Sequence, residues 1–218
     1  MKFIETYKII NLNSAKAIFM KICIVSLVLI FSLQSLSKAD DIRDFEIEGI
    51  SIGDSLFEHS DIIDRTKKQI LDANLFFYPK SKRFALWNIK SNNFKTYESV
   101  QFSIDPNNFT IYRISGMIYD LDKNECVNIQ KSIIKSLEKD NPTAVKDIED
   151  FDNIDYLDKS GESIANGIYL DFPSGDTFSV ECYLYGKTYK EKNNQKDHIR
   201  VSIETKENRE FIQNEAYD

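Results

Sequence analysis

A serine hydroxyl becomes a nucleophile when a neighbouring base takes its proton. Ser55 is the residue in this chain whose setting comes closest to that chemistry, because it sits where a predicted strand turns into a predicted helix. His59 and His198 are the two histidines and therefore the candidate bases. The competing interpretation is structural: Ser55 and Glu58 have the spacing of a helix-capping box. We expect Ser55 to cap a helix.

The residues 53–56, Gly-Asp-Ser-Leu, resemble the signature of the GDSL lipases and esterases. That resemblance implies a late Asp-x-x-His that supplies the acid and the base, but Gln195 stands where the Asp before His198 is required. The Gly-x-Asn-Asp block of that family and its alternating β/α pattern are also missing. An esterase built on Ser55 is therefore an alternative that lacks most of the family's site, and we assign no catalytic residue and no cofactor.

Two acidic segments suggest calcium binding. Residues 120–124 begin like an EF-hand loop, but Glu125 and Lys131 occupy the positions that require Gly and Glu. Asp122 and Glu125 instead predict a helix-capping box. The segment Asp147–Asp158 carries six acids and remains open as a looser calcium site, with a solvated loop as the alternative. No metal ligand is assigned.

Two cysteines follow the apolar amino-terminal segment, namely Cys126 and Cys182. Cys126 belongs to the apolar face of a predicted helix and Cys182 to the apolar face of a predicted strand. If the helix covers the sheet, the two sulfurs can meet, so we predict a disulfide. Two buried free thiols are the alternative.

The amino terminus has the pattern of an export signal. Lys21 precedes an apolar run from Ile22 to Leu33, and Ser37-Lys38-Ala39 places small residues at the −3 and −1 positions of a cleavage site. We predict cleavage after Ala39, with Met20 as an alternative start that would make 1–19 a mis-called extension. The predicted location is the periplasm or the extracellular space. An uncleaved signal anchor that tethers the protein to a membrane is the alternative.

The charge of the exported part limits its partners. Residues 1–39 hold five of the 28 basic and one of the 35 acidic residues, so their removal changes the net charge from −7 to −11. A chain this acidic repels nucleic acid and anionic membrane surfaces. A basic protein partner or a small molecule fits better, although acidity also serves solubility alone.

The hydrophobic pattern predicts an α+β fold with mostly antiparallel strands. In the first half we expect a strand over 44–52, a helix over 55–74, and strands over 83–90, 97–104 and 109–119. In the second half we expect a helix over 122–139, a loop over 141–165, three strands around Ile168–Phe172, Phe178–Leu184 and Ile199–Ile203, and a short helix after Thr205. We expect residues 40–218 to form one domain, with the helices on one face of the sheet. The domain could also consist of two αβββ halves, about 40–119 and 120–218.

Tyr183 and Tyr185 alternate with Cys182 and Leu184 along one predicted strand. Side chains alternate between the faces of a sheet, so the two tyrosines should lie on the face away from the core. We predict that they form an exposed contact patch.

Several segments resemble a group of uncharacterised small exported bacterial proteins. They are residues 48–56 (Glu-Gly-Ile-Ser-Ile-Gly-Asp-Ser-Leu), 97–102, 114–116, Cys126, Cys182 and 200–207. The resemblance implies a bacterial cell-envelope location and no substrate. We therefore expect an exported binding or protein-interaction module without catalytic chemistry. The alternatives are an envelope hydrolase using Ser55 and an acidic inhibitor or assembly factor with a basic partner.

Overall fold

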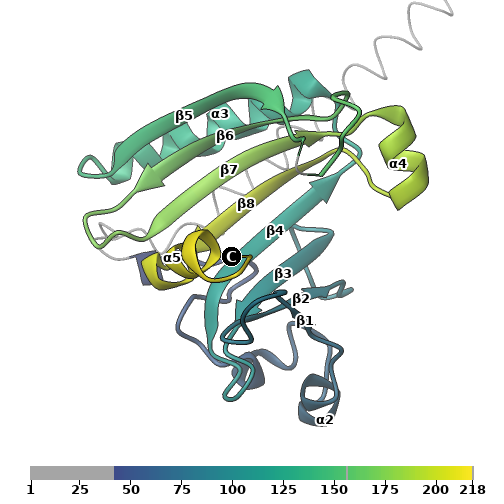
Figure 1. The fold of residues 1–218 in the computed structure, drawn as a ribbon. Coiled ribbons are helices and arrows are strands. Elements are labelled where there is room, and N and C mark those ends of the chain that lie inside the picture. The colour runs from purple at the N-terminus through teal and green to yellow at the C-terminus, as the bar shows by residue number, and fades with distance from the viewer. Residues whose placement is uncertain (1–41, 156, 218) are drawn as a thin grey trace, which may run out of the picture.

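The computed structural model describes residues 42–155 and 157–217 (Figure 1). The predicted signal segment, its cleavage site after Ala39 and the alternative start at Met20 lie outside the described residues. In chain order the elements are η1 (Ile42–Asp44), η2 (Leu56–His59), α2 (Lys67–Leu71), β1 (Phe76–Phe77), β2 (Ala85–Ile89), β3 (Ser99–Ile104), β4 (Ile111–Tyr119), α3 (Lys123–Asp140), β5 (Val145–Asn153), β6 (Ile164–Asp171), β7 (Thr177–Leu184), α4 (Lys187–Asn193), β8 (His198–Glu204) and α5 (Lys206–Asn214).

All eight strands form one antiparallel sheet in the order β1-β2-β3-β4-β8-β7-β6-β5. Each half of the chain contributes a four-stranded meander, and the pairing of β4 with β8 joins the two meanders at the centre. The predicted α+β class is confirmed. Each meander has one strand more than predicted, namely β1 and β5.

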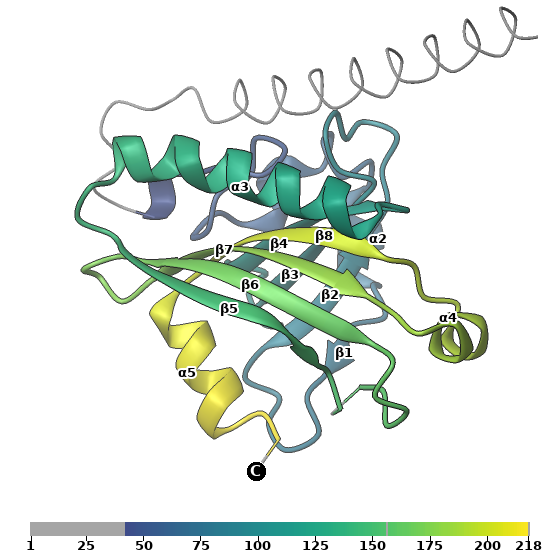
Figure 2. The ribbon, with the colours of Figure 1, turned by 90° about the horizontal axis from the view of Figure 1, so that it is seen from above.

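The helix α3 covers one face of the sheet, and α5 packs on the opposite face (Figure 2). The expectation that the helices lie on one face is therefore wrong for α5, because Phe211 packs with Tyr78 and Phe84 in a cluster separate from the main core. The apolar residues of α3 pack on those of β7 and β8 in the main core, which also holds the segment from Ile42 to Ile70. Gln130 of α3 donates a hydrogen bond to the carbonyl of Val180 at 2.7 Å. Phe211 of α5 packs in a smaller aromatic cluster with Tyr78 and Phe84. One sheet face therefore carries the main core, and the other is only partly covered.

Of the two predicted helix-capping boxes, one forms as expected and the other does not. Asp122 and Glu125 form the predicted capping box at the start of α3. The Ser55 hydroxyl instead accepts a hydrogen bond from the Phe57 N–H at 3.4 Å, so it caps only the short η2. The second capping box in the described part belongs to Thr66 and Gln69, at the start of α2.

The first thirty described residues differ most from the prediction. The expected strand over 44–52 is only a bridge between Ile47 and Ile50, closed by a turn with positive φ at Glu48 and Gly49. The expected helix over 55–74 is interrupted at Asp64, which also has a positive φ. Three of its apolar side chains, Leu56, Ile63 and Ile70, are nevertheless fully buried, whereas Leu71 is 56% exposed. Two short helices, η2 and α2, and the turn between them thus bury these three side chains in place of one continuous helix.

The expected loop over 141–165 is also wrong, because Val145–Asn153 forms β5, an edge strand paired with β6. Its side chains are almost all exposed and many are acidic. The burial alternation that reveals a strand in a sequence is absent at such an edge.

Candidate binding site on the polar sheet face

Three serines occupy the centre of the sheet face opposite α3. Ser115 of β4, Ser202 of β8 and Ser179 of β7 are direct cross-strand partners, so they form a row across three neighbouring strands. We call this row the serine trench. Its side chains are buried, at 0%, 4% and 7% exposure, because larger neighbours stand on both sides. Small residues at the centre of a sheet face leave a depression where larger ones would fill it.

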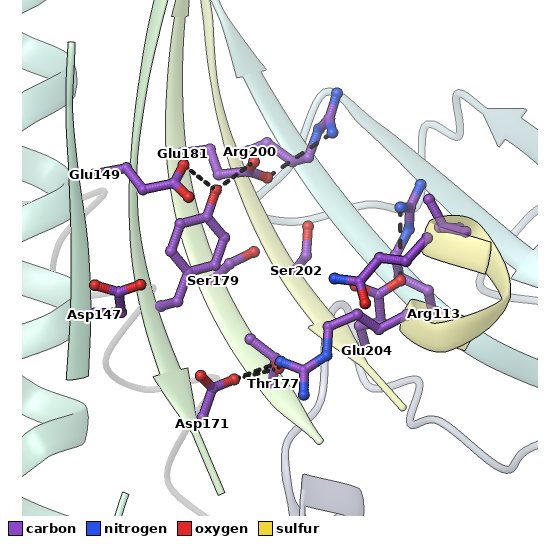
Figure 3. A pocket seen from close by; sticks show the side chains of 14 residues that line it. Arg113, Asp147, Glu149, Asp171, Thr177, Ser179, Glu181, Arg200, Ser202 and Glu204 are labelled. Carbon is purple, nitrogen blue, oxygen red and sulfur yellow. Dashed lines mark hydrogen bonds and ion pairs between the residues drawn. The ribbon is translucent and has the colours of Figure 1, made fainter. Parts of the chain in front are cut away.

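Long charged side chains form the walls of this depression (Figure 3). The hollow has a volume of about 400 Å³. Its lining alternates along the strands, as expected for one face of a sheet. The lining residues are Arg113, Asp147, Glu149, Tyr169, Asp171, Thr177, Ser179, Glu181, Arg200, Ser202, Glu204, Arg209, Ile212 and Gln213.

The arginines of the hollow differ in how closely they contact carboxylates. Arg209 of α5 lies 2.6 Å from Asp171 and also donates to the carbonyl of Gly175, so it is firmly held. Arg113 lies 3.8 Å from Glu204, and Arg200 lies 3.9 Å from Glu181. Arg113 also donates to Gln101 at 2.9 Å. The contacts of Arg113 and Arg200 with their carboxylates are longer than that of Arg209, and the Arg200 guanidinium also lies over the Tyr183 ring, 4.6 Å from its centre.

Tyr169 lies at the β5 end of the hollow. Its ring covers Gly167, where an added Cβ would come within 2.5 Å of the ring. Its hydroxyl lies 3.2 Å from a carboxylate oxygen of Glu149 and 3.3 Å from one of Glu181. Burial first, and then the two carboxylates, raise the pKa of Tyr169 above its usual range. The phenol therefore stays protonated and available as a donor at neutral pH.

A second hollow of about 580 Å³ adjoins the first where β5 is bulged. The two hollows share Glu149, Tyr169 and Glu181. The second adds the carboxylates of Asp150 and Asp152. The combined depression is therefore most acidic on the side of β5.

Ser179 presents its hydroxyl to the hollow. The residue is 7% exposed, and it lines the hollow. Ser202 by contrast donates to Ser115 at 2.8 Å. Among the residues that the structure describes, none hydrogen-bonds the Ser179 hydroxyl. The Ser179 hydroxyl is thus accessible from the hollow, where water or a ligand can meet it.

The cysteines are joined as predicted. Cys126 of α3 and Cys182 of β7 form a disulfide with a Cα–Cα distance of 6.0 Å, and both are fully buried. The bond ties the helix to the core face of the strand whose opposite face contributes Ser179 and Glu181. It thus supports the floor of the hollow from behind.

The predicted exposed patch of Tyr183 and Tyr185 is wrong. The alternation of β7 is as expected, but the two residues are only 6% and 9% exposed. Tyr183 stacks on His198 with ring centres 5.0 Å apart, and Ile154 packs in the same cluster. The segment after β5 and the neighbouring rings cover this end of the face, which strand alternation alone does not reveal.

The geometry around Ser55 does not assemble a nucleophile. The Nε2 atom of His59 lies 2.7 Å from the Asp54 carboxylate. His198 is buried, its Nδ1 lies 3.0 Å from the carbonyl oxygen of Lys196, and burial lowers its pKa to about 4. In the described ranges, neither imidazole hydrogen-bonds the Ser55 hydroxyl. Ser55 is therefore a capping residue without a base.

The acidic segment Asp147–Asp158 does not close around a common point, since most of it is the extended β5. Asp158 accepts hydrogen bonds from Ser160 and Ser163 and so stabilises a turn. The described residues contain one group of three potential metal ligands, Asp54, Glu58 and His59, whose ligand atoms lie within 4.8 Å of one another. The close contact between His59 and Asp54 satisfies that pair without an ion.

Comparison with protein families, curated proteins and solved structures finds no significant match. The site therefore has to be interpreted from its own chemistry. No helix in the described part of the chain is both long and apolar enough to cross a membrane.

Sequence reasoning missed the serine trench, although a signal for it was present. Between the apolar residues of β7 lie Thr177, Ser179 and Glu181, and β8 carries Arg200, Ser202 and Glu204 in the same way. The two strands therefore present matched polar rows. The missing information was that β4, with Arg113 and Ser115, lies beside β8.

Proposed function

We propose that this chain is an exported binding module of the cell envelope that holds a polar ligand in the hollow over the serine trench and does no chemistry on it. The observation that carries the proposal is the hollow itself, with a small-residue floor, charged walls and the Ser179 hydroxyl in its lining. Ligand pockets typically combine such a depression with a few convergent polar groups.

The absence of a base near Ser55 favours binding over hydrolysis, since no nucleophile is activated there within the described residues. The disulfide supports the proposed location, because structural disulfides persist in oxidising compartments outside the cytosol. Mass spectrometry of envelope fractions tests the export step. The expected mature chain begins at Asp40 and carries the bridge, whereas a retained leader would contradict cleavage after Ala39.

A trench-filling variant tests the binding function. Ser179→Leu projects a larger side chain into the hollow, and Thr143→Leu, in the exposed connection before β5, is the matched control. Thermal unfolding is measured with diamines, dicarboxylates, polyols and amino acids. A ligand present at 100 times its Kd stabilises the folded state by about 2.7 kcal/mol, which raises Tm by roughly 5–10 °C for a domain of this size.

We expect at least one compound class to stabilise the wild-type and Thr143→Leu proteins and to lose its effect in Ser179→Leu. Circular dichroism verifies that both variants fold. A panel that shifts none of the three proteins, or shifts them equally, would refute the trench as the binding site.

A second candidate function is the acidic partner-binding factor, and the exposed edge strand β5 favours it. β5 ends the sheet and presents Asp147, Glu149, Asp150 and Asp152. Extended segments can add to such an edge through backbone hydrogen bonds. Ile148→Pro would remove a backbone donor from β5 and should weaken binding of an extended Lys-rich peptide while leaving small-molecule binding over the trench intact.

A further inference from the structure

The free edge of the sheet at β1 carries exposed aromatic side chains. Phe76 is 59% exposed and Phe77 is 38% exposed, and Tyr217, close to the end of the chain, is 60% exposed. The ring centre of Tyr78 lies 6.4 Å from that of Phe76 and 5.6 Å from that of Tyr217. We call Phe76, Phe77 and Tyr217 the aromatic edge. Large apolar side chains that gather on a surface typically mark a contact with a protein or a membrane.

The loop between β1 and β2 places two lysines beside the aromatic edge. The Nζ atom of Lys82 lies 5.9 Å from the ring centre of Phe77. The backbone N–H of Lys80 donates to the carbonyl of Ala216, the residue before Tyr217. Both lysine side chains are exposed. Within the part of the chain that the structure describes, neither forms an ion pair, so both charges are available to a negative surface.

The third cation of this loop, Arg83, is already engaged. Its guanidinium lies 2.5 Å from the carboxylate of Glu207 and 3.0 Å from that of Glu215. The two acids that reach the loop from α5 and from its end are therefore drawn to Arg83. The lysines remain the groups that a ligand of opposite charge would meet.

Charge is unevenly distributed along the exported part of the chain. Residues 73–97, which contain β1, the loop and β2, hold five basic residues and no acid. The net charge of −11 over residues 40–218 therefore divides into +5 for this segment and −16 for the rest.

The sheet order separates the two kinds of charge in space. The acidic strand β5 is the other free edge of the same sheet, at the opposite end from β1 (Figure 1). Seven strand spacings of about 4.8 Å, roughly 34 Å along the sheet, lie between the two edges. That separation exceeds the Debye length of about 8 Å at physiological salt. A surface in contact with β1 therefore responds to the charge of this edge and not to the net charge of the chain.

We propose that the aromatic edge docks the protein onto an anionic lipid bilayer, with Phe76 and Phe77 entering the interface and Lys80 and Lys82 contacting the headgroups. Aromatic rings favour the boundary between headgroups and acyl chains, and lysines beside them are attracted to anionic lipid. Two consecutive exposed phenylalanines favour a bilayer over an anionic polymer, because a bilayer removes their apolar surface from water. The acidic edge β5 then faces away from the membrane.

This inference goes beyond the proposed binding in the hollow and does not depend on it. The net charge of the chain predicts repulsion from anionic membranes, and that expectation applies to the β5 edge. At β1 the local charge is of the opposite sign.

Vesicle flotation tests the docking. The chain from Asp40 onward contains the complete sheet with α3 and α5, and it is used because the apolar run from Ile22 to Leu33 would bind vesicles by itself. Circular dichroism verifies its fold. We expect binding to vesicles of equal parts phosphatidylglycerol and phosphatidylcholine, with at least about tenfold weaker binding to phosphatidylcholine alone. Binding should also weaken between low and physiological salt.

The double variant Lys80→Gln with Lys82→Gln tests the charged part of the surface. Each lysine near an anionic surface contributes about a factor of five, so the variant should bind anionic vesicles about thirtyfold more weakly. Lys187→Gln with Lys192→Gln, at exposed positions of α4, changes the net charge equally and is the matched control. Its affinity should stay close to that of the wild-type protein.

The double variant Phe76→Ser with Phe77→Ser tests the aromatic part and should weaken binding at least about tenfold. Val145→Ser with Ile148→Ser removes two exposed apolar side chains from the opposite edge β5 and should have no effect. All four side chains are exposed, so the fold should survive both changes, as circular dichroism verifies. If the phenylalanine variant does not fold, the lysine pair decides.

Absence of binding to anionic vesicles would overturn the proposal, as would equal binding to both lipid compositions. Equal losses in a test variant and its matched control would also overturn it, because the contact would then lie elsewhere or depend on net charge alone. A single-stranded oligonucleotide and polyglutamate serve as competing probes. Binding of either one in preference to vesicles would assign the aromatic edge to an anionic polymer and refute membrane docking.

Discussion

Reduction of the bridge between Cys126 and Cys182 should remove a large part of the stability of the fold. The cysteines are 56 positions apart, so the bridge closes a loop of roughly 57 residues. In the chain-entropy treatment, a loop of that length stabilises the folded state by about 4 kcal/mol relative to the open chain. For a domain of this size, the loss corresponds to a decrease in Tm of roughly 8–16 °C.

Reduction is a cleaner perturbation than substitution, because both sulfurs are fully buried and removal of a sulfur would add a cavity. The helix should remain in place, since Ile129, Ile133 and Leu137 still pack on the sheet and Gln130 still bonds Val180. Far-ultraviolet circular dichroism of the reduced protein should therefore resemble that of the oxidised protein at 25 °C.

The measurement is urea unfolding at pH 7 with and without a phosphine reductant, with thiol titration to prove that both cysteines are free. We expect the free energy of unfolding to decrease by several kcal/mol, and the urea dependence to increase because the open chain exposes more surface. A decrease below about 1 kcal/mol, with both thiols titrated, would refute the loop-entropy reasoning for this bridge.

Three further predictions concern other residues. Burial lowers the pKa of His198 to about 4, so between about pH 6.5 and 4 the imidazole is protonated in the unfolded chain but not in the folded one. The contribution of His198 to the free energy of unfolding should be constant above pH 6.5 and should decrease by about 3 kcal/mol as the pH is lowered to 4. Urea unfolding measured against pH should show this decrease for the wild-type protein and not for His198→Phe. Gly167→Ala should cost about 1–3 kcal/mol because the new Cβ meets the Tyr169 ring, and a double-mutant cycle with Tyr169→Ala, measured by urea unfolding, should recover most of that cost. Asp122→Ala should cost about 1 kcal/mol in thermal unfolding through loss of the α3 capping box, whereas Asp140→Ala at the other end of the helix should be close to neutral.

The parts of the fold that the sequence predicts are those with one buried side. In β8 the apolar residues Ile199, Val201 and Ile203 alternate with polar ones, and all three are at most 3% exposed. In α3 the apolar residues recur at helical spacing and the first turn has its own cap. The disulfide could be predicted for the same reason, since each cysteine lies in an apolar row. In these elements the periodic apolar row is the row that the fold buries.

Two other segments could not be predicted from their side-chain pattern. β5 is acidic and exposed because it is an edge, so its strand character comes from hydrogen bonds to β6 and not from its side chains. The segment from Ser55 to Asn74 has apolar residues at helical spacing, but Asp64 adopts a positive φ and the chain turns there. Both cases reflect tertiary contacts that outweigh local preference.

The candidate site also has a part that the sequence pattern predicts and a part that depends on tertiary contacts. The rows of β7 and β8 are visible in the sequence as alternating polar residues, yet a hollow also needs a third neighbouring row and a wall. Arg113 reaches it only because β4 pairs with β8 across about 85 residues of sequence, and Arg209 only because α5 folds back over that face. The hollow thus depends on the joining of two meanders, which no local pattern encodes. Substitutions that weaken the β4–β8 pairing should therefore affect ligand binding before they affect the disulfide-tied packing of α3 on β7.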